Sequence, residues 1–474
     1  MIRTRIAPSP TGQDIHVGTI ATALMNYAWA KKNNGKFIVR IEDTDRSRWV
    51  KGSEERMLKT LNEIGLTADE SPLVGGNFGP YRQSERLDLY KKYAEQLVKS
   101  GHAYYCTCSK ERLDKLREER QKQKLIPRYD KFCLSRQEII ADEIKKGSSY
   151  VVRLNVEPGK EIIINDIVRG EVRFNTDNID DQVLLKSDGF PTYHLAVVVD
   201  DHLMEISHVI RAEEWLSSTP KHILIYRALG WDLPVFCHVS LLRNSDRSKL
   251  SKRKNPVWAS DYLSQGILPK ALLNYLSLMG WSHPEEKEIY TLDEYVNVFD
   301  PKDLQKTAPV FDPVKLEWMN GEYIRQLKVK SLELKVINYI GDKYNRDIVG
   351  RTIPLIQSRM KKFADYLPLC GFFFTAPEKY EIDLSGKKNM LEDIHKELES
   401  MADWKAVVIG ESMQKLAERL SIKNSEFFTI LRVAISGKKV SPPLNESMEI
   451  LGKEECLERI KKLIGPPSRK LTMV

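Results

Sequence analysis

The first 42 residues constrain the fold of this chain more than any other segment. Residues 2–7 and residues 36–42, KFIVRIE, are short apolar or alternating runs, which are typical of β-strands. Between them, residues 18–33 have the pattern of a helix, and a turn rich in proline and glycine precedes it. A strand, a helix and a second strand in this order are the unit from which parallel sheets are built. The segment therefore predicts an α/β protein with a parallel sheet.

The middle of the chain continues with helices but adds a segment of different character. Residues 53–64 and 84–100 have helical periodicity, whereas residues 150–175 alternate in the β manner, as an antiparallel insertion would. The dense apolar run at residues 192–201, TYHLAVVVDD, ends in acidic residues and indicates a buried parallel strand. Residues 218–220 then carry the signals of a helix start.

The pattern changes after about residue 240. Residues 256–282 and 313–323 are helical in pattern, and from about residue 324 amphipathic helical patterns continue almost to the end. The sequence contains no internal repeat and no low-complexity segment. It thus predicts a parallel α/β core that is interrupted by a β-containing insertion and followed by an all-helical tail.

Length and composition limit the class of protein. A chain of 474 residues predicts about three domains, at the usual ~150 residues each. With 42% hydrophobic and 30% charged residues we expect an ordinary soluble protein, and no stretch approaches the ~18 apolar residues of a membrane span. The N-terminus lacks the apolar core of a secretory signal, and six cysteines are too few for a disulfide scaffold. We therefore expect a cytoplasmic protein.

Two short motifs carry residues suited to phosphate chemistry. The segment HVGT, residues 16–19, opens a helix, where backbone N–H groups and a histidine can approach phosphate. Residues 244–254, NSDRSKLSKRK, form a loop in which Lys249, Lys252, Arg253 and Lys254 lie among serines. Taken alone, the first motif also fits an ordinary helix start and the second a solvated run of charge. Together and in this order, they resemble the HIGH and KMSKS signatures of class I aminoacyl-tRNA synthetases.

Longer blocks resemble one family within that class, the bacterial glutamyl-tRNA synthetases. They are APSPTG (7–12), RIEDTDR (40–46), GPYRQSERL (79–87), LLKSDGFPTYHLA (184–196), VIRAEEWLSSTP (209–220), LNYLSLMGW (273–281), FDPVKLEWMNGEYI (311–324) and LRVAISGKKVSPPL (431–444). The blocks cover essentially the whole chain.

The resemblance implies a fold of four parts. A Rossmann-type catalytic domain with a parallel sheet is expected at residues 1–84 and 191–238, with an α/β domain for the tRNA acceptor end inserted at residues 85–190. A stem-contact domain with the KLSKRK loop is expected at residues 239–324, and a helical anticodon-binding region at residues 325–474.

The resemblance also implies a reaction, the ATP-dependent ligation of L-glutamate to tRNA(Glu). The α-carboxylate of glutamate attacks the α-phosphate of ATP and gives glutamyl-adenylate and pyrophosphate. The acyl group then passes to the terminal ribose of the tRNA, with release of AMP. Such chemistry depends on positioning and positive charge. ATP with Mg²⁺ is thus expected at His16, Gly18, Lys249 and Lys252, of which His16, Lys249 and Lys252 are expected to be catalytic. The loop 244–254 is expected to close on ATP.

Recognition of glutamate is expected to depend on two arginines, because two guanidinium groups suit the two carboxylates of this substrate. The resemblance places Arg5 and Arg211 at the amino acid. It places Ser9 and Glu42 near the amino group of the substrate and Tyr193 near its side chain.

One position near this expected pocket departs from the family pattern. The pattern YHLA is followed by Asn in the family and by Val197 here. A hydrogen bond to the substrate is therefore either missing or supplied elsewhere. Trp215 is expected near the same pocket.

Three cysteines, Cys106, Cys108 and Cys133, have a spacing that relatives with zinc share. Thiolates suit zinc, and closed structural sites usually have four ligands. In some relatives a histidine two residues after the last cysteine is a candidate, but here that residue is Ser135. The remaining candidate is Tyr129, at a spacing seen in a shortened relative. The sequence leaves two interpretations open, namely one structural Zn²⁺ on these four residues and three reduced, partly buried cysteines.

Two further regions concern tRNA. Residues 109–136 carry ten Lys/Arg against five Asp/Glu, which fits either a solvated helix face or a footprint for phosphate backbone. A helical tail is typical of bacterial glutamyl enzymes, whereas glutaminyl-tRNA synthetases read the anticodon with β-barrels. Within the tail, Arg359 lies where the family has an arginine that faces the third anticodon base, and a generic surface arginine is the alternative.

We therefore expect a monomeric enzyme of this family, with tRNA(Glu), L-glutamate and ATP as partners and no membrane. A glutaminyl-tRNA synthetase is the nearest alternative, and the helical tail disfavours it. A non-catalytic tRNA-binding paralogue is an alternative from a different class. The intact HVGT and KLSKRK motifs disfavour that second alternative.

Overall fold

The computed structural model describes residues 1–251 and 256–465. These residues form two compact units, the first made of residues 1–263 and 269–313, the second of residues 264–268 and the chain from residue 314 onward. Lys252 of the predicted ATP site lies outside the described residues. The finer division into four domains stays a prediction.

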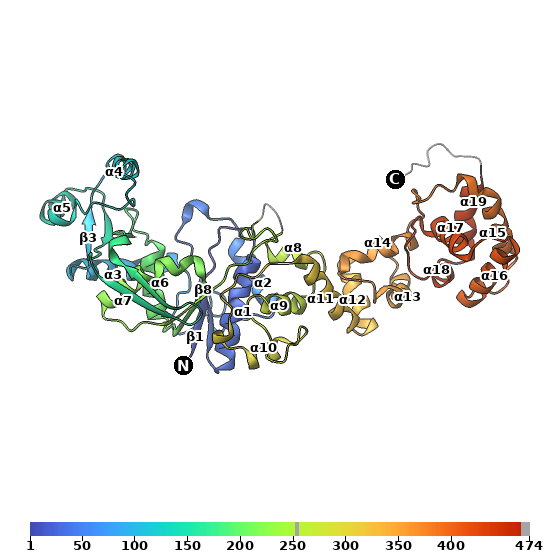
Figure 1. The fold of residues 1–474 in the computed structure, drawn as a ribbon, viewed down its shortest axis with the longest axis horizontal. Coiled ribbons are helices and arrows are strands. Elements are labelled where there is room, and N and C mark those ends of the chain that lie inside the picture. Colours follow the sequence, from blue (N-terminus) through green and yellow to red (C-terminus); the bar gives the residue numbers. More distant parts are fainter. Residues whose placement is uncertain (252–255, 466–474) are drawn as a thin grey trace. The chain divides into compact units, whose positions relative to one another are not determined.

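The strand–helix–strand unit expected at the N-terminus is present (Figure 1). The core elements of the first unit are β1 (Arg3–Ile6), α1 (Val17–Lys32), β2 (Lys36–Val39), β8 (His208–Ala212) and β9 (Val235–Val239). β1 pairs with β2, and β8 with β9, both in parallel. β8 lies beside β1, where the backbone N–H of Ser207 donates to the carbonyl of Arg3 at 3.0 Å. The prediction of a parallel core is therefore confirmed.

The insertion contains antiparallel strands, as predicted, but they belong to two different sheets. One sheet consists of β3 (Ala103–Cys106), β4 (Val151–Leu154) and β7 (Val183–Leu185), in the order β3-β4-β7. The other strands, β5 (Glu161–Asp166) and β6 (Gly170–Asn175), form a hairpin that continues the sheet of β9 and β8, in the order β6-β5-β9-β8. β5 meets β9 in parallel, with Asp166 opposite Phe236. The alternating pattern predicted the hairpin but not its attachment to the core.

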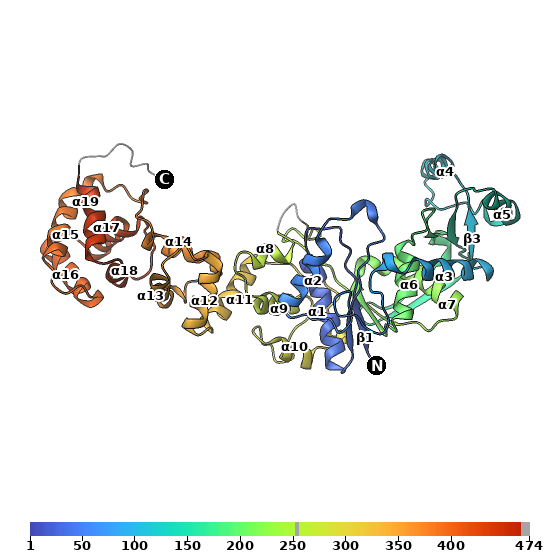
Figure 2. The same ribbon diagram turned by 180° about the vertical axis from the view of Figure 1, so that it is seen from behind.

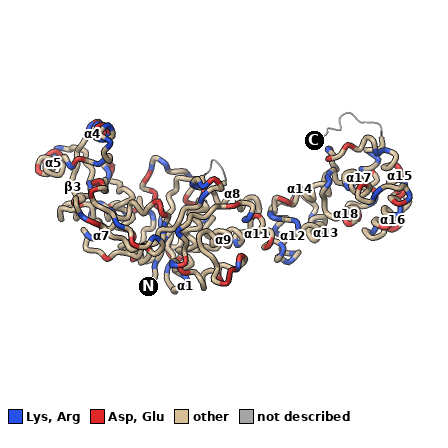
Figure 3. The backbone as a smooth tube through the Cα atoms, viewed as in Figure 1, with Lys and Arg blue, Asp and Glu red and all other residues tan. Residues whose placement is uncertain are grey.

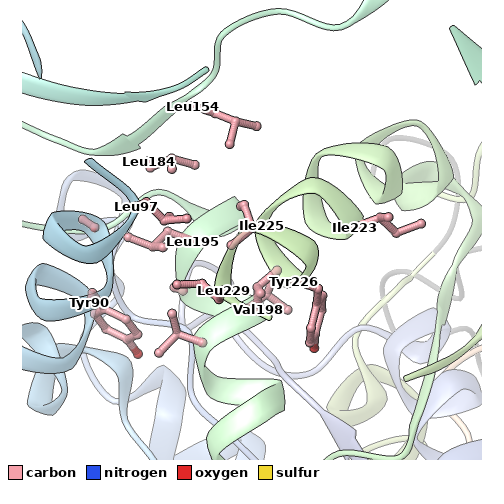
Figure 4. Close-up of a cluster of buried hydrophobic side chains, with 14 of the residues drawn as sticks. Tyr90, Leu97, Leu154, Leu184, Leu195, Val198, Ile223, Ile225, Tyr226 and Leu229 are labelled. Atoms are coloured by element: carbon pink, nitrogen blue, oxygen red, sulfur yellow. The ribbon is translucent and has the colours of Figure 1, made fainter. Parts of the chain in front are cut away.

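The prediction of a buried strand at residues 192–201 is wrong. These residues belong to the helix α6 (Tyr193–Leu203), in which every residue from Leu195 to Asp201 is buried. A continuous apolar run has no period that separates a buried helix from a buried strand. The helix is buried because α3 (Leu87–Lys99) and α7 (Thr219–Leu229) pack against it, with Tyr90, Leu97, Ile223 and Tyr226 in one apolar cluster (Figure 4).

Further helices complete the first unit. They are α2 (Ser53–Glu63), α4 (Lys110–Lys122), α5 (Gln137–Lys145), α8 (Ala259–Leu263), α9 (Pro269–Ser277) and α10 (Leu292–Val298). α9 and α10 lie beside α1, as the views from both sides show (Figure 1, Figure 2). α7 starts with Pro220 in its first turn, as the sequence predicts.

Among its described residues, the second unit has helices and no strand. Its helices are α11 (Pro313–Arg325, whose first residue belongs to the first unit), α12 (Val329–Ile340), α13 (Arg346–Ile356), α14 (Tyr366–Cys370), α15 (Lys388–Ser400), α16 (Ala406–Arg419), α17 (Asn424–Ser436), α18 (Leu444–Leu451) and α19 (Lys453–Ile464). The helices from α15 onward bury a common apolar core around Ile394, Phe427 and Leu431. The predicted helical tail is confirmed. Across residues 1–251 and 256–465, no helix is both long and apolar enough to cross a membrane.

Candidate active site

A pocket of about 330 Å³ opens where β1, β8 and β9 end, next to the start of α1. In open α/β sheets, ligands bind at this carboxyl end of the strands. Of the residues predicted for the site, those that line this pocket are Arg5, His16, Gly18, Glu42, Tyr193, Arg211 and Lys249. Trp215 also lines it. Ser9 is exposed and is not among the lining residues.

His16 forms the N-cap of α1. Its Nδ1 accepts a hydrogen bond from the backbone N–H of Gly18 at 2.9 Å. A Cβ atom on residue 18 would lie 3.1 Å from that same nitrogen, so a glycine at this position leaves room for the His16 ring. The positive end of the helix dipole therefore faces the pocket together with an imidazole.

The segment that follows the KLSKRK loop is hydrogen-bonded to the HVGT segment. The backbone N–H of Val17 donates to the carbonyl of Val257 at 2.8 Å, and the N–H of Ala259 donates to the carbonyl of Ile15 at 3.1 Å. Lys249 also reaches the pocket wall, where its Nζ lies 2.5 Å from the carboxylate of Glu214. The two motifs, more than 200 residues apart in sequence, thus meet at one pocket.

Arg5 forms an ion pair with Asp201, a buried acidic residue that was not predicted from the sequence. Nε and Nη2 of Arg5 donate to the two carboxylate oxygens of Asp201 at 3.0 and 3.1 Å. Arg40, which is fully buried, donates to Asp201 at 2.8 Å and to Glu42 at 3.3 Å. Burial raises the pKa of Glu42, although Arg40 and Arg5 act in the opposite direction. The only local signal of this network was the pair of acidic residues that ends the apolar run.

Among the described residues, Arg211 donates only to neutral acceptors. Nε donates to His238 at 3.1 Å, and Nη1 donates to the Tyr193 hydroxyl at 3.0 Å and to His222 at 3.3 Å. Nη2 donates to the Thr219 hydroxyl at 2.8 Å and to a backbone carbonyl at 3.4 Å. The residue is 6% exposed and forms no ion pair with any described residue. The pocket wall therefore carries a buried guanidinium without a counter-charge.

Comparison with known proteins identifies the family. A family model described as "tRNA synthetases class I (E and Q), catalytic domain" matches residues 1–318, and one described as "Anticodon binding domain" matches residues 315–464. This chain belongs to the class I synthetases for glutamate and glutamine. The resemblance stated from the sequence blocks is thereby confirmed.

The relatives of this synthetase include named enzymes of nearly the same length. The glutamate–tRNA ligase of Acidothermus cellulolyticus is 45% identical, over 97% of this chain and 95% of that protein. The glutamate–tRNA ligase of Dehalococcoides mccartyi is 44% identical, over 98% of both chains. A crystal structure of a glutamate tRNA ligase from Elizabethkingia meningosepticum, in complex with its amino acid, is 36% identical with a TM-score of 0.86, over 98% of this chain and 99% of that one.

Val197, the position expected to differ from the family pattern, lies in an apolar environment. Val197 is 2% exposed and belongs to the apolar cluster around α6. It does not line the pocket. Val197 therefore packs in this apolar cluster and offers no hydrogen bond to a ligand in the pocket.

The three cysteines of the insertion converge. The sulfur atoms of Cys106, Cys108 and Cys133 all lie within 4.8 Å of one another, and the sulfurs of Cys108 and Cys133 are 3.5 Å apart. The Tyr129 hydroxyl lies 3.2 Å from the sulfur of Cys108 and 3.6 Å from that of Cys106. A hydrogen bond from Cys133 lowers the pKa of the Cys106 thiol well below its usual range. Two sulfurs at 2.3 Å from a tetrahedral ion are about 3.8 Å apart, so the four residues fit one zinc ion.

Two regions predicted to meet tRNA have different environments. In α4, which has no buried residue, Lys and Arg are interspersed with Asp and Glu (Figure 3). Lys122 and Lys124, at the end of this helix and just beyond it, are exposed.

In the second unit, Arg359 donates to the carbonyl of Ser441 at 2.6 Å, and Arg432 donates to the hydroxyl of the same serine at 2.7 Å. Burial and the neighbouring Arg359 lower the pKa of Arg432.

Proposed function

We propose that this pocket is the active site of an ATP-dependent glutamate–tRNA ligase. The enzyme joins L-glutamate to tRNA(Glu) through glutamyl-adenylate and releases AMP and pyrophosphate. The observation that carries the assignment is Arg211, a buried guanidinium on the pocket wall with no ion-pair partner among the described residues. A buried cation without a counter-charge favours a carboxylate ligand. The named relatives support the same function.

Glutamate is bound by the strand ends of the sheet. Its two carboxylates meet two guanidinium groups, and Arg5 takes the carboxylate of the side chain. The amino group is bound by Glu42, with Ser9 as a second contact, and Tyr193 contacts the side chain. Ser9 has the weakest support of these residues, because it is exposed and does not line the pocket.

ATP, with its Mg²⁺, is bound at the start of α1. There His16 and the helix dipole favour phosphate, and Gly18 leaves space for the His16 ring. Lys249 exchanges its exposed pair with Glu214 for a phosphate oxygen, at small cost because exposed ion pairs contribute little. Lys252, outside the described residues, adds the charge that stabilises the phosphates as the carboxylate attacks. Mg²⁺ bound with ATP supplies further positive charge there.

The glutamate site is tested by Arg211→Ala in steady-state glutamylation of tRNA. Removing one partner of a buried charge pair costs about 3–5 kcal/mol, so we expect the KM for glutamate to rise about a hundredfold or more. The KM for ATP should change little. Arg227→Ala is the matched control, since Arg227 is exposed on the neighbouring helix α7. Equal changes in the two Michaelis constants would contradict the assignment.

The role of the KLSKRK loop is tested by Lys252→Ala. Loss of one preorganised group that stabilises transition-state charge typically slows the reaction about 100- to 1,000-fold. We expect that loss in ATP–pyrophosphate exchange with tRNA present, while tRNA binding stays unchanged. A variant with near-normal exchange would eliminate Lys252 as a catalytic residue.

The choice of tRNA is tested by charging purified glutamate and glutamine tRNAs side by side. The all-helical described part of the second unit and the matching anticodon family model support tRNA(Glu) as the substrate. We expect glutamate on tRNA(Glu). Glutamine on its own tRNA would favour the glutaminyl alternative, and no charging with either amino acid would favour a binding paralogue. We also infer that the protein is cytoplasmic and monomeric. The mass of a dimer in analytical ultracentrifugation would contradict the monomer.

We further propose that Cys106, Cys108, Tyr129 and Cys133 bind one structural zinc ion. The convergence of the three sulfurs and the phenol supports this site. Zinc would hold the insertion together, since the cysteines come from β3, the turn after it and the segment before α5. Tyr129 is the weakest of the four ligands, because burial raises the pKa of its phenol and coordination requires the phenolate.

Metal analysis of the purified protein tests the zinc site. We expect one zinc per chain, its loss in Cys133→Ser, and weaker retention against a chelator in Tyr129→Phe. Cys370→Ala, which removes a buried thiol of the second unit, should keep the metal. Absence of zinc from the unmodified protein after preparation with added zinc would leave the interpretation of three reduced cysteines.

A further inference from the structure

A row of hydrogen-bonded side chains crosses three neighbouring strands behind the pocket. In the order β5-β9-β8, the row consists of Asp166, His238 and Arg211. The parallel register places Arg211 opposite His238, and it places Asp166 opposite Phe236, two residues before His238. An Asp166 oxygen lies 2.6 Å from Nδ1 of His238, and Nε of Arg211 donates to Nε2 of His238 at 3.1 Å. All three residues are buried.

The chemistry of these groups determines where the imidazole proton lies. A guanidinium nitrogen is only a donor, so Nε2 of His238 must be the acceptor. The proton of the neutral ring is then on Nδ1, from which it is donated to Asp166. Burial lowers the pKa of His238, which favours this neutral form. The Asp166 carboxylate is itself held by the backbone N–H groups of Val168 at 3.0 Å and Arg169 at 2.9 Å.

The row orients Arg211 without neutralising it. Arg5 makes a direct bidentate pair with Asp201, whereas the negative charge of Asp166 reaches Arg211 only through a neutral ring. The Thr219 hydroxyl accepts from Nη2 of Arg211 at 2.8 Å and lies 3.1 Å from the same ring nitrogen of His238, so it adds a second contact that holds the guanidinium. The positive charge therefore remains available to a ligand in the pocket.

We propose that His238 and Asp166 are positioning residues for substrate recognition by Arg211. They set the orientation of the guanidinium that receives a carboxylate of glutamate, much as outer-shell partners orient histidine ligands at metal sites. The inference rests on the proposed function of the pocket. Neither residue touches the substrate in this arrangement, so the effect of each is transmitted through Arg211.

Two substitutions of His238 distinguish the role of its Nε2, which faces Arg211, from that of its Nδ1, which faces Asp166. In His238→Gln, the amide oxygen reaches roughly the position of Nε2 and can still accept from Arg211. In His238→Asn, the shorter amide stays near Nδ1, and the acceptor for Arg211 is lost. Hydrogen bonds to charged groups contribute about 1.5–3 kcal/mol, so we expect His238→Asn to raise the KM for glutamate roughly ten- to a hundredfold. His238→Gln should restore most of this loss, and the KM for ATP should be unchanged in both variants.

Asp166→Asn gives an independent test, because its remaining oxygen can still accept from the backbone while its amide cannot accept from the ring. A folded Asp166→Asn variant should show the same rise in the KM for glutamate as His238→Asn, with no change in the KM for ATP. His283→Asn is the control, since His283 is a buried histidine that packs against Trp281 and has no part in the pocket. Circular dichroism and thermal melting establish that each variant is folded.

The outcomes are distinguishable. The positioning role would be overturned by any of three results. One is an equal KM for glutamate in His238→Gln and His238→Asn, and another is a parallel rise in the KM for ATP. The third is an unchanged KM for glutamate in folded Asp166→Asn. If His238→Asn does not fold, Asp166→Asn and His238→Gln still decide the question. Failure of the unmodified enzyme to charge any tRNA with glutamate would overturn the proposed function instead.

Discussion

Glu42 shows how a single half-buried carboxyl can give the reaction a pH dependence. Burial raises its pKa above that of an exposed glutamate, so it takes up a proton at a higher pH. The carboxylate is the form that binds an ammonium group. We therefore expect kcat/KM for glutamate to fall as the pH is lowered from neutral through this raised pKa, and to recover as the pH is raised again. In Glu42→Gln, kcat/KM should be about tenfold or more lower at neutral pH, and this acidic decline should be absent. Steady-state kinetics over the acidic range check this, and an identical decline in both proteins would rule it out.

The last turn of α6 illustrates stabilisation at the scale of elements. Asp200 accepts hydrogen bonds from Arg86 at 2.7 Å and from the Tyr90 hydroxyl at 2.8 Å, and it lies 3.6 Å from Arg40. It therefore ties α6 to α3 and to the segment after β2 at a fully buried position. Asp200→Asn removes the negative charge that faces the buried Arg86 and Arg40. We expect the free energy of unfolding of the first unit, measured with urea, to fall by about 3–5 kcal/mol. Glu63→Gln on α2 is the control, because its exposed pair with Lys59 should contribute less than about 1 kcal/mol. A similar loss in both variants would contradict this account.

At the scale of the whole molecule, tRNA binding should depend steeply on salt. Each phosphate contact contributes a slope of about −0.7 to −0.9 in log affinity against log salt concentration. Neutralising the exposed Lys122 and Lys124 should weaken the binding of all tRNAs to a similar degree and reduce this slope, because phosphate contacts carry no sequence information. Arg359→Gln should instead change the discrimination between glutamate and glutamine tRNAs. Filter binding at several salt concentrations with both tRNAs checks this. The same effect in the lysine variant and in Arg359→Gln would disprove these separate roles.

Local patterns predicted a large part of this protein. The β1–α1–β2 unit, the hairpin of the insertion and the helical tail all have the period or the turn signals of their structures, so their residues alone identify them. The family blocks assigned the reaction class, and most of the site residues predicted from them do line the pocket. Cysteine spacing likewise predicted sulfurs that do converge.

Tertiary structure alone decided which distant residues meet. The run at 192–201 is a buried helix against which α3, α7 and β7 pack, and an apolar run has no period that could indicate this. The ion pair between Asp201 on helix α6 and Arg5 on β1 depends on where that helix packs. The row from Asp166 to Arg211 depends on the order and register of strands far apart in sequence. A strand's sequence specifies which faces are apolar but not which edge it joins, because backbone hydrogen bonds are the same for every partner. The family's chemistry was therefore evident from the sequence. The packing decided the charge balance, which leaves Arg211 without an ion-pair partner among the described residues.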